Sequence, residues 1–328
     1  MKKRKLGWTD LELTTIGLGT WAIGGGGWEW GWGPQDDEES IATIRRALEL
    51  GVNWIDTAPI YGFGRSERIV SKAIAGLREK PIIATKCGLI WDERKKVSNC
   101  LKGDSIRAEV ERSLERLGVD VIDLYQIHQP IPDEDIEEAW GTLAELVREG
   151  KIRYAGVSNF NVEQLERIKS IHPIASVQPP YNMLIREIEE ELLEFCAEKK
   201  IGVITYSPME RGLLTGKFTK DRVKNLPEDD HRRKDPMFQE PELSVHLKLV
   251  ERLRPIAERN GRTLAQLAIA WVLRRPEVTA AIVGARHPYQ IEETIVAGDW
   301  ELSEEDIVAI DEMLEKHQEE LLSVGKSK

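Results

Sequence analysis

The sequence has little cysteine and no metal-binding motif. Three cysteines, Cys87, Cys100 and Cys196, stand far apart among 328 residues and form no C-x-x-C pair. An odd number of widely spaced cysteines is typical of a reducing compartment, so we interpret all three as free thiols. The six histidines contain no H-x-x-x-H pair. We therefore predict neither a disulfide framework nor a metal site.

Positive charge is also scarce. The chain has 46 Lys and Arg residues against 57 Asp and Glu, which gives a net charge of -11 and a pI of about 5.3. A surface that binds nucleic acid or an anionic membrane normally carries an excess of Lys and Arg. We therefore expect neither nucleic acid nor a membrane as a partner.

The chain has no long apolar run. Its longest uncharged stretch, residues 13–28, is too short and too rich in glycine to span a bilayer of about 30 Å. The basic start resembles the beginning of a signal peptide, but Asp10 and Glu12 interrupt the apolar segment that such a peptide needs. We therefore expect a cytoplasmic protein, and a monomer.

Short β-branched runs alternate with longer segments of helical period. Eight runs are predicted as strands: residues 14–19, 53–56, 82–87, 122–128, 152–158, 175–178, 203–207 and 280–284. Seven segments between them show apolar residues at i, i+3 and i+4: residues 38–50, 66–78, 105–117, 133–149, 162–170, 188–199 and 263–273. Eight parallel strands with crossover helices close into a barrel. We predict a single-domain (β/α)8 TIM barrel over residues 1–328, with a doubly wound open sheet as the alternative.

Two segments depart from the alternation of strands and helices. Residues 5–13 read as a hairpin that turns near Thr9 and Asp10, which we predict to plug the barrel floor. After Ser207, at the end of the seventh strand, a long loop rich in proline and charge precedes the next helical pattern. Long loops in compact domains are usually functional or disordered. We predict that this loop is a lid over a cofactor or substrate.

Polar residues stand at or just beyond the ends of three apolar runs. Asp56 ends one run and Tyr61 follows it, Lys86 stands near the end of the next, and His128 ends a third. Singly, such an Asp often caps a helix, such a Lys is often a solvated tip, and one His is usually packing. The carboxyl ends of barrel strands open onto one face, so the four side chains can converge there. Together they predict an active site.

The loop after the first barrel strand is rich in glycine and tryptophan. Residues 17–22 fit G-x-G-x-x-G/A, but a glycine-rich run follows where a dinucleotide fingerprint must open a helix, so we reject a Rossmann interpretation. The four tryptophans of this loop, Trp21, Trp28, Trp30 and Trp32, cannot all enter one core, although packing remains the alternative. We predict that tryptophans line a substrate cleft at the barrel mouth, with Trp21, Trp28, Trp30 and Trp91 as the candidates.

The motifs around these residues resemble those of a known family. N-W-I-D-T-A-P-I-Y-G at residues 53–62, A-T-K at 84–86 and Y-Q-I-H at 125–128 closely resemble the active-site signatures of the aldo-keto reductases. Further matches are G-V-S-N-F, Q-P-P-Y-N, Y-S-P and G-A-R, which begin at Gly156, Gln178, Tyr206 and Gly284. The resemblance covers nearly the whole chain. It implies an enzyme that reduces a small-molecule aldehyde or ketone with NADPH, with NADH as a weaker alternative.

The resemblance also implies catalytic roles. Tyr61 would be the general acid, Lys86 would lower its pKa, Asp56 would hold Lys86, and a neutral His128 would orient the carbonyl oxygen. A cation about 4 Å away at an effective dielectric near 20 contributes about 4 kcal/mol, or roughly three pKa units. We therefore expect the pKa of Tyr61 to lie near neutrality, although Asp56 cancels part of this field.

For the cofactor, the resemblance implies that Ser158, Asn159 and Gln178 bind the carboxamide of nicotinamide and that Tyr206 stacks on its ring. Arg286 suits a ribose 2′-phosphate. Many family members have a Lys-Ser pair in place of Gly284-Ala285, so discrimination here should depend on Arg286. The full set expected to bind cofactor is Trp21, Ser158, Asn159, Gln178, Tyr206, Ser207, Pro208, Leu213, Gly216, Lys217, Gly284, Arg286, Gln290, Glu293 and Thr294.

Two other functions remain as alternatives. Some relatives of this family are non-catalytic barrels that keep a cofactor as a regulatory subunit. A barrel aldolase or isomerase would instead use Lys86 for Schiff-base chemistry. Turnover of a generic aldehyde separates the first from a reductase, and trapping by borohydride with substrate would support the second.

Overall fold

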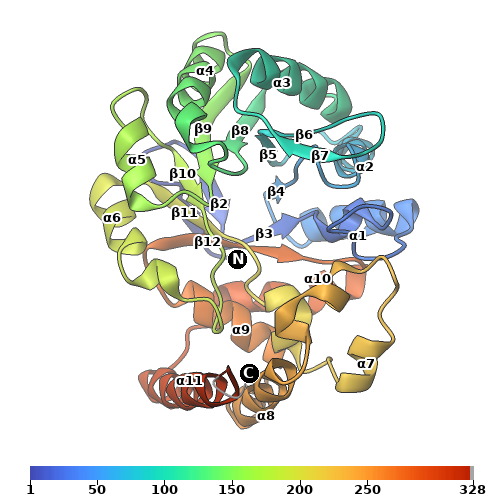
Figure 1. The fold of residues 1–328 in the computed structure, drawn as a ribbon, viewed down its shortest axis with the longest axis vertical. Helices are drawn as coiled ribbons and strands as arrows, with labels where there is room; N and C mark the ends of the chain where they lie inside the picture. The colour runs from blue at the N-terminus through green and yellow to red at the C-terminus, as the bar shows by residue number, and fades with distance from the viewer. Residues whose placement is uncertain (326–328) are drawn as a thin grey trace.

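The computed structural model describes residues 1–325; residues 326–328 of the predicted domain lie outside the described residues. Eight parallel strands form a closed barrel that is surrounded by helices (Figure 1). The strands are β3 (Ile16–Gly19), β4 (Trp54–Asp56), β5 (Ile82–Cys87), β8 (Ile122–Ile127), β9 (Ile152–Ser158), β10 (Ser176–Gln178), β11 (Gly202–Thr205) and β12 (Val278–Gly284). Each overlaps a predicted strand. The predicted (β/α)8 barrel is therefore confirmed, and the open sheet is excluded.

The seven predicted helices are present close to their expected positions. They are α1 (Asp37–Glu49), α2 (Arg65–Ile74), α3 (Gly103–Leu117), α4 (Ile136–Arg148), α5 (Val162–Ile168), α6 (Leu192–Lys199) and α9 (Leu264–Leu273). Their ends follow local chemistry. At the start of α9, Thr263 accepts from the backbone of Gln266 and the Gln266 side chain accepts in return, which forms a capping box. Helix α3 ends at Gly118 in the left-handed conformation, with φ 65°.

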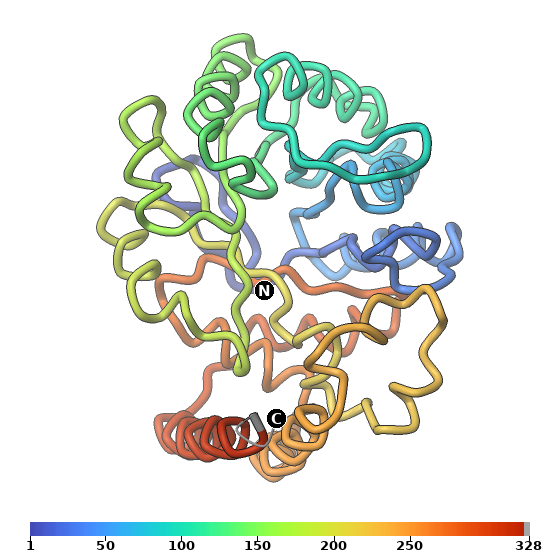
Figure 2. The backbone as a smooth tube through the Cα atoms, in the orientation of Figure 1, coloured from blue at the N-terminus to red at the C-terminus, as the bar shows by residue number. Residues whose placement is uncertain are grey.

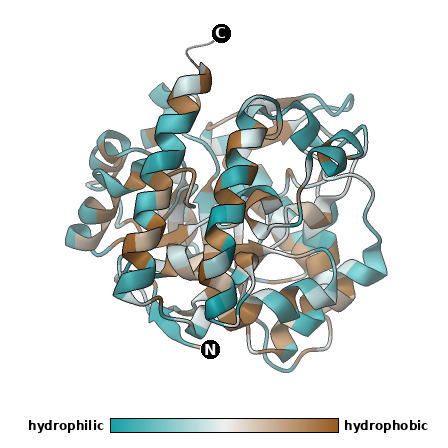
Figure 3. Cartoon of the chain, turned by 90° about the horizontal axis from the view of Figure 1, so that it is seen from below, coloured by the Kyte–Doolittle hydropathy of each residue, from teal (hydrophilic) through white to brown (hydrophobic). Residues whose placement is uncertain are grey.

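Three further helices complete the outer layer: α8 (Glu242–Arg259), α10 (Pro288–Thr294) and α11 (Glu304–Gly325). Helix α11 was not predicted. Seen from below in Figure 3, α8 and α11 run side by side in front of the barrel, with much of their outward surface hydrophilic. Leu249 of α8 and Ile310 of α11 are both buried and belong to the same hydrophobic core. No helix among residues 1–325 is both long enough and apolar enough to cross a membrane.

The predicted hairpin closes the barrel floor. It consists of β1 (Lys3–Lys5) and β2 (Glu12–Thr14), which pair antiparallel. Leu6, Leu11 and Leu13 are buried and pack in one cluster with Trp54 and residues of five further barrel strands. Burying apolar surface contributes about 25 cal/mol per Å², so this small plug stabilises the floor of the barrel. The opposite end of the barrel is left open.

The long segment after β11 is folded rather than irregular. It contains a turn of 3-10 helix (Glu210–Thr215), helix α7 (Lys220–Lys224) and two shorter 3-10 turns (His231–Lys234 and Pro236–Phe238). We call residues 208–241 the lid. The lid has its own small core around Leu213, Phe218 and Phe238. Figure 2 traces it beside the barrel, in yellow and orange at the lower right.

A short hairpin at the barrel mouth was not predicted. Strands β6 (Leu89–Trp91) and β7 (Val97–Asn99) form an antiparallel hairpin after β5. The turn between them contains no glycine, and Lys95 takes the left-handed conformation at φ 62°. The usual Asn-Gly or Asp-Gly signal of a hairpin is therefore missing from the sequence.

Candidate active site

Four polar side chains meet at the mouth of the barrel. Asp56 ends β4, Lys86 lies in β5, His128 follows β8, and Tyr61 lies in the loop between β4 and α2. Strands β4, β5 and β8 are consecutive in the barrel, and the carboxyl ends of parallel strands open onto one face. The structure therefore brings the four predicted residues into one site.

Lys86 is the centre of this group. Its Nζ donates to Asp56 Oδ1 at 2.7 Å, to the carbonyl oxygen of Thr57 at 3.0 Å and to the Tyr61 hydroxyl oxygen at 3.4 Å. A lysine ammonium has three N–H donors, so all of them are used here and the Tyr61 oxygen accepts. The hydroxyl hydrogen of Tyr61 then remains available to a ligand in the cavity.

Asp56 is held from its other side. Its Oδ2 accepts from Gln178 Nε2 at 2.8 Å and from Gln126 Nε2 at 3.5 Å. Both carboxylate oxygens therefore have partners, and a buried charge needs such partners to be tolerated. The two amides fix the carboxylate that in turn orients Lys86.

Burial governs the ionisation of Lys86 and Tyr61. Burial lowers the pKa of Lys86, while the Asp56 carboxylate raises it and so offsets part of that effect. For Tyr61, burial raises the pKa well above its ordinary value of 10.0, and the charge of Asp56 raises it further. The expectation that Lys86 brings the Tyr61 pKa near neutrality is therefore wrong for this structure. Asp56 neutralises the lysine charge, and the buried phenol has lost its water.

His128 is neutral near pH 7, as expected from the sequence. Burial, and secondly the charge of Lys86, lower the pKa of His128 well below 6.5. Its ring meets the Tyr61 ring edge to face, with centroids 6.0 Å apart. The backbone carbonyl of His128 accepts from Asn159 Nδ2 at 2.9 Å. A neutral imidazole retains one N–H donor. This donor stands at the same end of the cavity as the Tyr61 hydroxyl.

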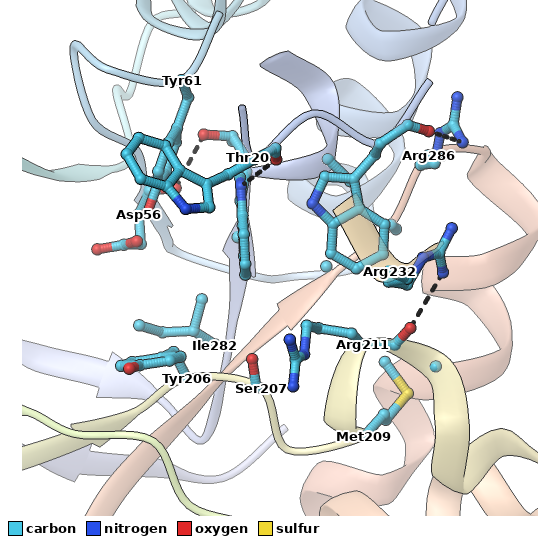
Figure 4. Close-up of a pocket in the computed structure, with 18 of the residues that line it drawn as sticks. Thr20, Asp56, Tyr61, Tyr206, Ser207, Met209, Arg211, Arg232, Ile282 and Arg286 are labelled. Atoms are coloured by element: carbon cyan, nitrogen blue, oxygen red, sulfur yellow. Dashed lines mark hydrogen bonds between the residues drawn. The ribbon is translucent and has the colours of Figure 1, made fainter. Parts of the chain in front are cut away.

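A cavity of about 820 Å³ extends from these residues to the lid. In Figure 4, Tyr61 and Asp56 lie at one end of the cavity and Arg232 and Arg286 at the other. Of the predicted residues, the following line it: Trp21, Trp28, Trp30, Asp56, Tyr61, His128, Ser158, Asn159, Gln178, Tyr206, Ser207, Pro208, Lys217, Gly284, Arg286, Gln290, Glu293 and Thr294. Lys86 stands behind Tyr61, fully buried.

Next to Tyr61 and His128, polar side chains form a continuous hydrogen-bonded wall. Tyr206 donates its hydroxyl hydrogen to Asn159 Oδ1 at 2.9 Å, Asn159 Nδ2 donates to Ser158 Oγ at 3.0 Å, and Ser158 Oγ donates to the Gln178 carbonyl at 2.8 Å. Asn159 has φ 64°, a left-handed conformation that Asn tolerates better than most residues. The wall offers amide and hydroxyl groups beside the flat Tyr206 ring, which suits a planar ring that carries a carboxamide.

The far end of the cavity is rich in cations. Arg286 donates from Nε to Gln35 Oε1 at 2.6 Å and from Nη1 to the Trp32 carbonyl at 3.0 Å, and it also contacts the Pro34 carbonyl. A guanidinium has five N–H donors, so two remain for a ligand. Arg286 is thus engaged in holding the loop after β3, which its sequence context did not indicate.

The other predicted residues at this end have protein partners too. Lys217 Nζ lies 2.6 Å from Glu293 Oε2, an ion pair between the lid and α10. Gln290 Oε1 accepts from the backbone N–H of Arg286 at 2.7 Å. Gly284 leaves open space, because a Cβ built there would meet no atom within 4 Å. The backbone at Gly284 is therefore accessible to a bound molecule.

Besides Lys86, three predicted residues do not line the cavity. Leu213 is fully buried in the core of the lid. Gly216 lies where the lid packs on the start of α9, and a Cβ there would come within 2.5 Å of Leu264. Trp91 turns toward Phe63, with ring centroids 5.5 Å apart, and supports the aromatic wall from behind. Leu213 and Gly216 do lie in the loop after β11 where the sequence placed them, but which way each residue faces depends on packing within that loop. Trp91 lies in β6, a strand that was not predicted.

The structure adds residues that sequence patterns did not single out. From the lid, Arg222 and Arg232 line the cavity, and Arg232 pairs with Asp230 at 2.6 Å. Leu89 and Val97, from the β6–β7 hairpin, form an apolar wall near Trp30. The basic run Arg232-Arg233-Lys234 in the lid is the signal that could have identified Arg232. No comparable signal marks the hairpin.

Nearly the whole chain is similar to proteins of one known family. The sequence matches the Aldo/keto reductase family over residues 15–315. It is 43% identical over 310 residues to the aldo-keto reductase YhdN of Bacillus subtilis (strain 168), covering 94% of this chain and 92% of that protein. It is 38% identical over 329 residues to the NADH-specific methylglyoxal reductase of Escherichia coli (strain K12), covering 96% and 99%. The structure of the glycerol dehydrogenase AKR11B4 from Gluconobacter oxydans matches with a TM-score of 0.87 at 41% identity, covering 96% of this chain and 95% of that one.

Proposed function

This chain belongs to the aldo/keto reductase family, and we propose that it reduces aldehydes or ketones to alcohols with NADPH, with NADH as a weaker alternative. The coarser statement, a nicotinamide-dependent oxidoreductase on a (β/α)8 barrel, follows from the family and the fold. The observation that carries the proposal is the contact of 3.4 Å between Lys86 Nζ and the Tyr61 hydroxyl, at the closed end of the cavity.

Tyr61 acts as the proton donor in this proposal. Its raised pKa keeps the phenol protonated near pH 7, which is the form that a general acid needs. Once the proton passes to a carbonyl oxygen, the phenolate that remains faces the Lys86 ammonium. Lys86 therefore stabilises the charge that develops on Tyr61 during the reaction rather than before it. Asp56 keeps Lys86 in position for this task.

His128 orients the carbonyl group. Its neutral ring can donate one hydrogen bond to the oxygen that Tyr61 protonates, so both groups act on the same atom. A positively charged His128 beside Lys86 would add to the electrostatic cost of the buried site. The low pKa of His128 avoids that cost, and the neutral imidazole orients the carbonyl group through a hydrogen bond.

The polar wall would hold the reactive end of the cofactor. Ser158, Asn159 and Gln178 offer groups for the carboxamide, and the Tyr206 ring offers a face for stacking. A bound nicotinamide would supply the hydride. The amide oxygens of Asn159 and Gln178 can accept from the N–H groups of such a carboxamide, and Gly284 leaves room for the rest of the molecule.

The cations at the lid support a phosphorylated adenosine. Arg222, Arg232 and Arg286 all line the far end of the cavity, and Lys217 stands nearby. The Arg222 guanidinium forms no ion pair with a carboxylate among the described residues, and its one hydrogen bond there is to the Lys217 carbonyl at 2.8 Å. A charge-assisted contact to phosphate contributes about 1.5–3 kcal/mol. This favours NADPH, although the relative from Escherichia coli is named as specific for NADH.

The aromatic wall supports a substrate with an apolar body. Trp21, Trp28 and Trp30 line the cavity beside Tyr61, and the apolar side chains of Leu89 and Val97 continue the wall. Such a surface binds apolar and aromatic groups through burial and stacking. We expect aldehydes that carry an apolar or aromatic substituent to be bound better than small polar ones.

The substitution Tyr61→Phe tests the assignment of the acid. We expect kcat for an aldehyde to fall about 100- to 10,000-fold, the usual contribution of a general acid, while the Kd of NADPH changes less than about twofold. The control is Tyr154→Phe, which removes a hydroxyl that donates to Asp10 Oδ1 of the barrel-floor hairpin at 2.9 Å and keeps the ring that meets Trp8. A Tyr61→Phe enzyme that keeps most of its kcat would refute the assignment. A wild-type protein that binds NADPH but turns over no aldehyde or ketone would favour the regulatory barrel.

A further inference from the structure

The lid is docked on the tryptophan-rich loop that walls the cavity. The backbone N–H of His231 donates to the Gly31 carbonyl at 3.0 Å, and Trp32 forms an antiparallel bridge with Asp230. Asp229 Oδ2 accepts from the backbone N–H of Gly27 at 3.0 Å. Two segments that lie about two hundred residues apart in sequence are therefore joined at the edge of the active site.

His231 occupies the centre of this contact. Its ring stacks on Trp21, with centroids 5.0 Å apart and planes inclined by 28°. The same ring meets the Trp32 ring edge to face at 5.2 Å. Trp21 in turn stacks against Tyr61, with centroids 6.4 Å apart and planes inclined by 24°. A series of aromatic contacts thus leads from the lid to the proposed proton donor.

The ionisation and tautomer of His231 suit packing rather than catalysis. Its Nδ1 lies 3.0 Å from the Gly31 carbonyl, which can only accept, so Nδ1 carries the ring hydrogen. Nε2 is buried and has no hydrogen-bond partner among the described residues. Burial lowers the pKa of His231, so the ring is neutral. The hydrogen bond to Gly31 sets the rotation of the ring, and its flat face is presented to Trp21.

We propose that His231 is a substrate-positioning residue that acts through Trp21. His231 is absent from the cavity lining, whereas Trp21 lines the cavity beside Tyr61. Trp21 is also restrained by the hydrogen bond from its Nε1 to the Trp30 carbonyl at 3.0 Å and by the edge-to-face contact with Trp32 at 5.4 Å. The hydrogen bond fixes the edge of the indole, and the stack on His231 covers its flat face on the side of the lid. Docking of the lid therefore sets the wall that an aromatic substrate contacts, a role that rests on the proposed reductase function.

Three substitutions at His231 separate the aromatic stack from the hydrogen bond. His231→Phe keeps a ring but cannot donate to Gly31. His231→Asn keeps a side-chain N–H close to the position of Nδ1 but has no ring, and His231→Ala removes both. Lys234→Ala is the control, because Lys234 is exposed in the same turn of the lid. Each variant is assayed with benzaldehyde and with propanal, and the Kd of NADPH is measured separately.

We expect His231→Ala and His231→Asn to raise the KM for benzaldehyde about two- to tenfold, the range expected from the loss of one aromatic pair. The kcat for propanal and the Kd of NADPH should change less than about twofold in these variants, and His231→Phe should restore the KM. If His231→Phe is as impaired as His231→Ala, or if the Kd of NADPH rises in parallel, then docking of the lid matters and stacking on Trp21 does not. Wild-type behaviour of all three variants would also overturn the proposal.

A second measurement does not depend on turnover. In protein labelled with 5-fluorotryptophan, the resonance of Trp21 is assigned with Trp21→Phe and then followed in the His231 variants. We expect it to shift and broaden in His231→Ala and His231→Asn, and to return toward wild type in His231→Phe. A resonance that does not respond would show that His231 leaves Trp21 in place. Failure of wild-type turnover together with a responsive resonance would refute the reductase, and with it the substrate role, while the contact itself would stand.

Discussion

Glu109 makes the stability of this barrel depend on pH in a way that can be calculated. It lies on α3, is 4% exposed, and accepts from the backbone N–H of Gly88 at 2.9 Å, two residues after Lys86. Burial raises the pKa of Glu109 from 4.5 to about 7, although the hydrogen bonds from Gly88 and Ser105 lower it. The folded protein therefore binds this proton more tightly than the unfolded chain. The stability that this provides is complete below about pH 4.5 and is lost as the pH rises through about 7.

The size of the effect follows from the two pKa values. A difference of about 2.5 units, each equivalent to about 1.4 kcal/mol, corresponds to about 3 kcal/mol between the two ends of this pH range. Glu109→Gln keeps an acceptor for Gly88 but cannot ionise. We expect the free energy of unfolding of this variant, relative to wild type, to rise by up to about 3 kcal/mol as the pH increases from about 5 to 8. A constant offset caused by the amide itself does not affect this slope.

Urea unfolding, followed by tryptophan fluorescence at several pH values, measures the slope. Glu115→Gln is the matched control, because Glu115 is exposed on the same helix. Parallel stability curves for wild type and Glu109→Gln would refute the reasoning, since they would mean that the carboxyl ionises equally in both states. If the stability of Glu115→Gln relative to wild type rises equally with pH, then the pH dependence does not come from Glu109.

Three further predictions concern the cavity. Lys86→Met should reduce kcat at least about 100-fold at pH 7, because the phenolate of Tyr61 loses its stabilising charge; unchanged turnover with stopped-flow detection of NADPH would argue against this role. Arg222→Ala should weaken NADPH about 10- to 100-fold and leave NADH nearly unchanged, and titrations in which both cofactors weaken equally would assign Arg222 to the shared part of the molecule. Tyr206→Ala should weaken both cofactors by about 1–3 kcal/mol, whereas calorimetry that finds no change would show that the ring does not stack on the nicotinamide.

The barrel could be predicted because each of its strands and helices leaves a recognisable pattern in a short stretch of the sequence. Each buried strand is a short apolar run between segments of helical period, and eight such runs specify a closed barrel. The position of a residue at a strand end then determines where its side chain goes, which is why Asp56, Lys86 and His128 could be assigned to one face. The alternation of strands and helices carried this inference, and it required no knowledge of side-chain packing.

The parts that could not be predicted depend on contacts between distant segments. The alignment of His231 with Trp21 exists only because Asp230 and Trp32 pair across the barrel mouth. Arg286 was correctly expected at the cavity, but its engagement with the carbonyls of Trp32 and Pro34 depends on how the loop after β3 folds back. The prediction of the Tyr61 pKa was wrong for a related reason. The direction of the pKa shift follows from the balance of burial, Lys86 and Asp56, whereas the spacing of the residues in the sequence gives only the presence of the charged groups.

The root of the lid is held by contacts made within the lid itself. Glu210 and Arg211 have φ values of 42° and 50°, a conformation that costs about 1–3 kcal/mol for each residue. Glu210 is fully buried and accepts from Asn182 Nδ2 at 2.8 Å, while Arg211 contacts both Glu210 and Asp235. These ion pairs are made within the lid and offset the strain there. The guanidinium of Arg211 is therefore directed into the cavity by the lid itself. Farther along the lid, His231 contacts Trp21 and Trp32, whereas Lys217 pairs with Glu293 of α10. Changes at His231 can therefore alter the substrate wall without altering the side chains that the barrel strands hold in place.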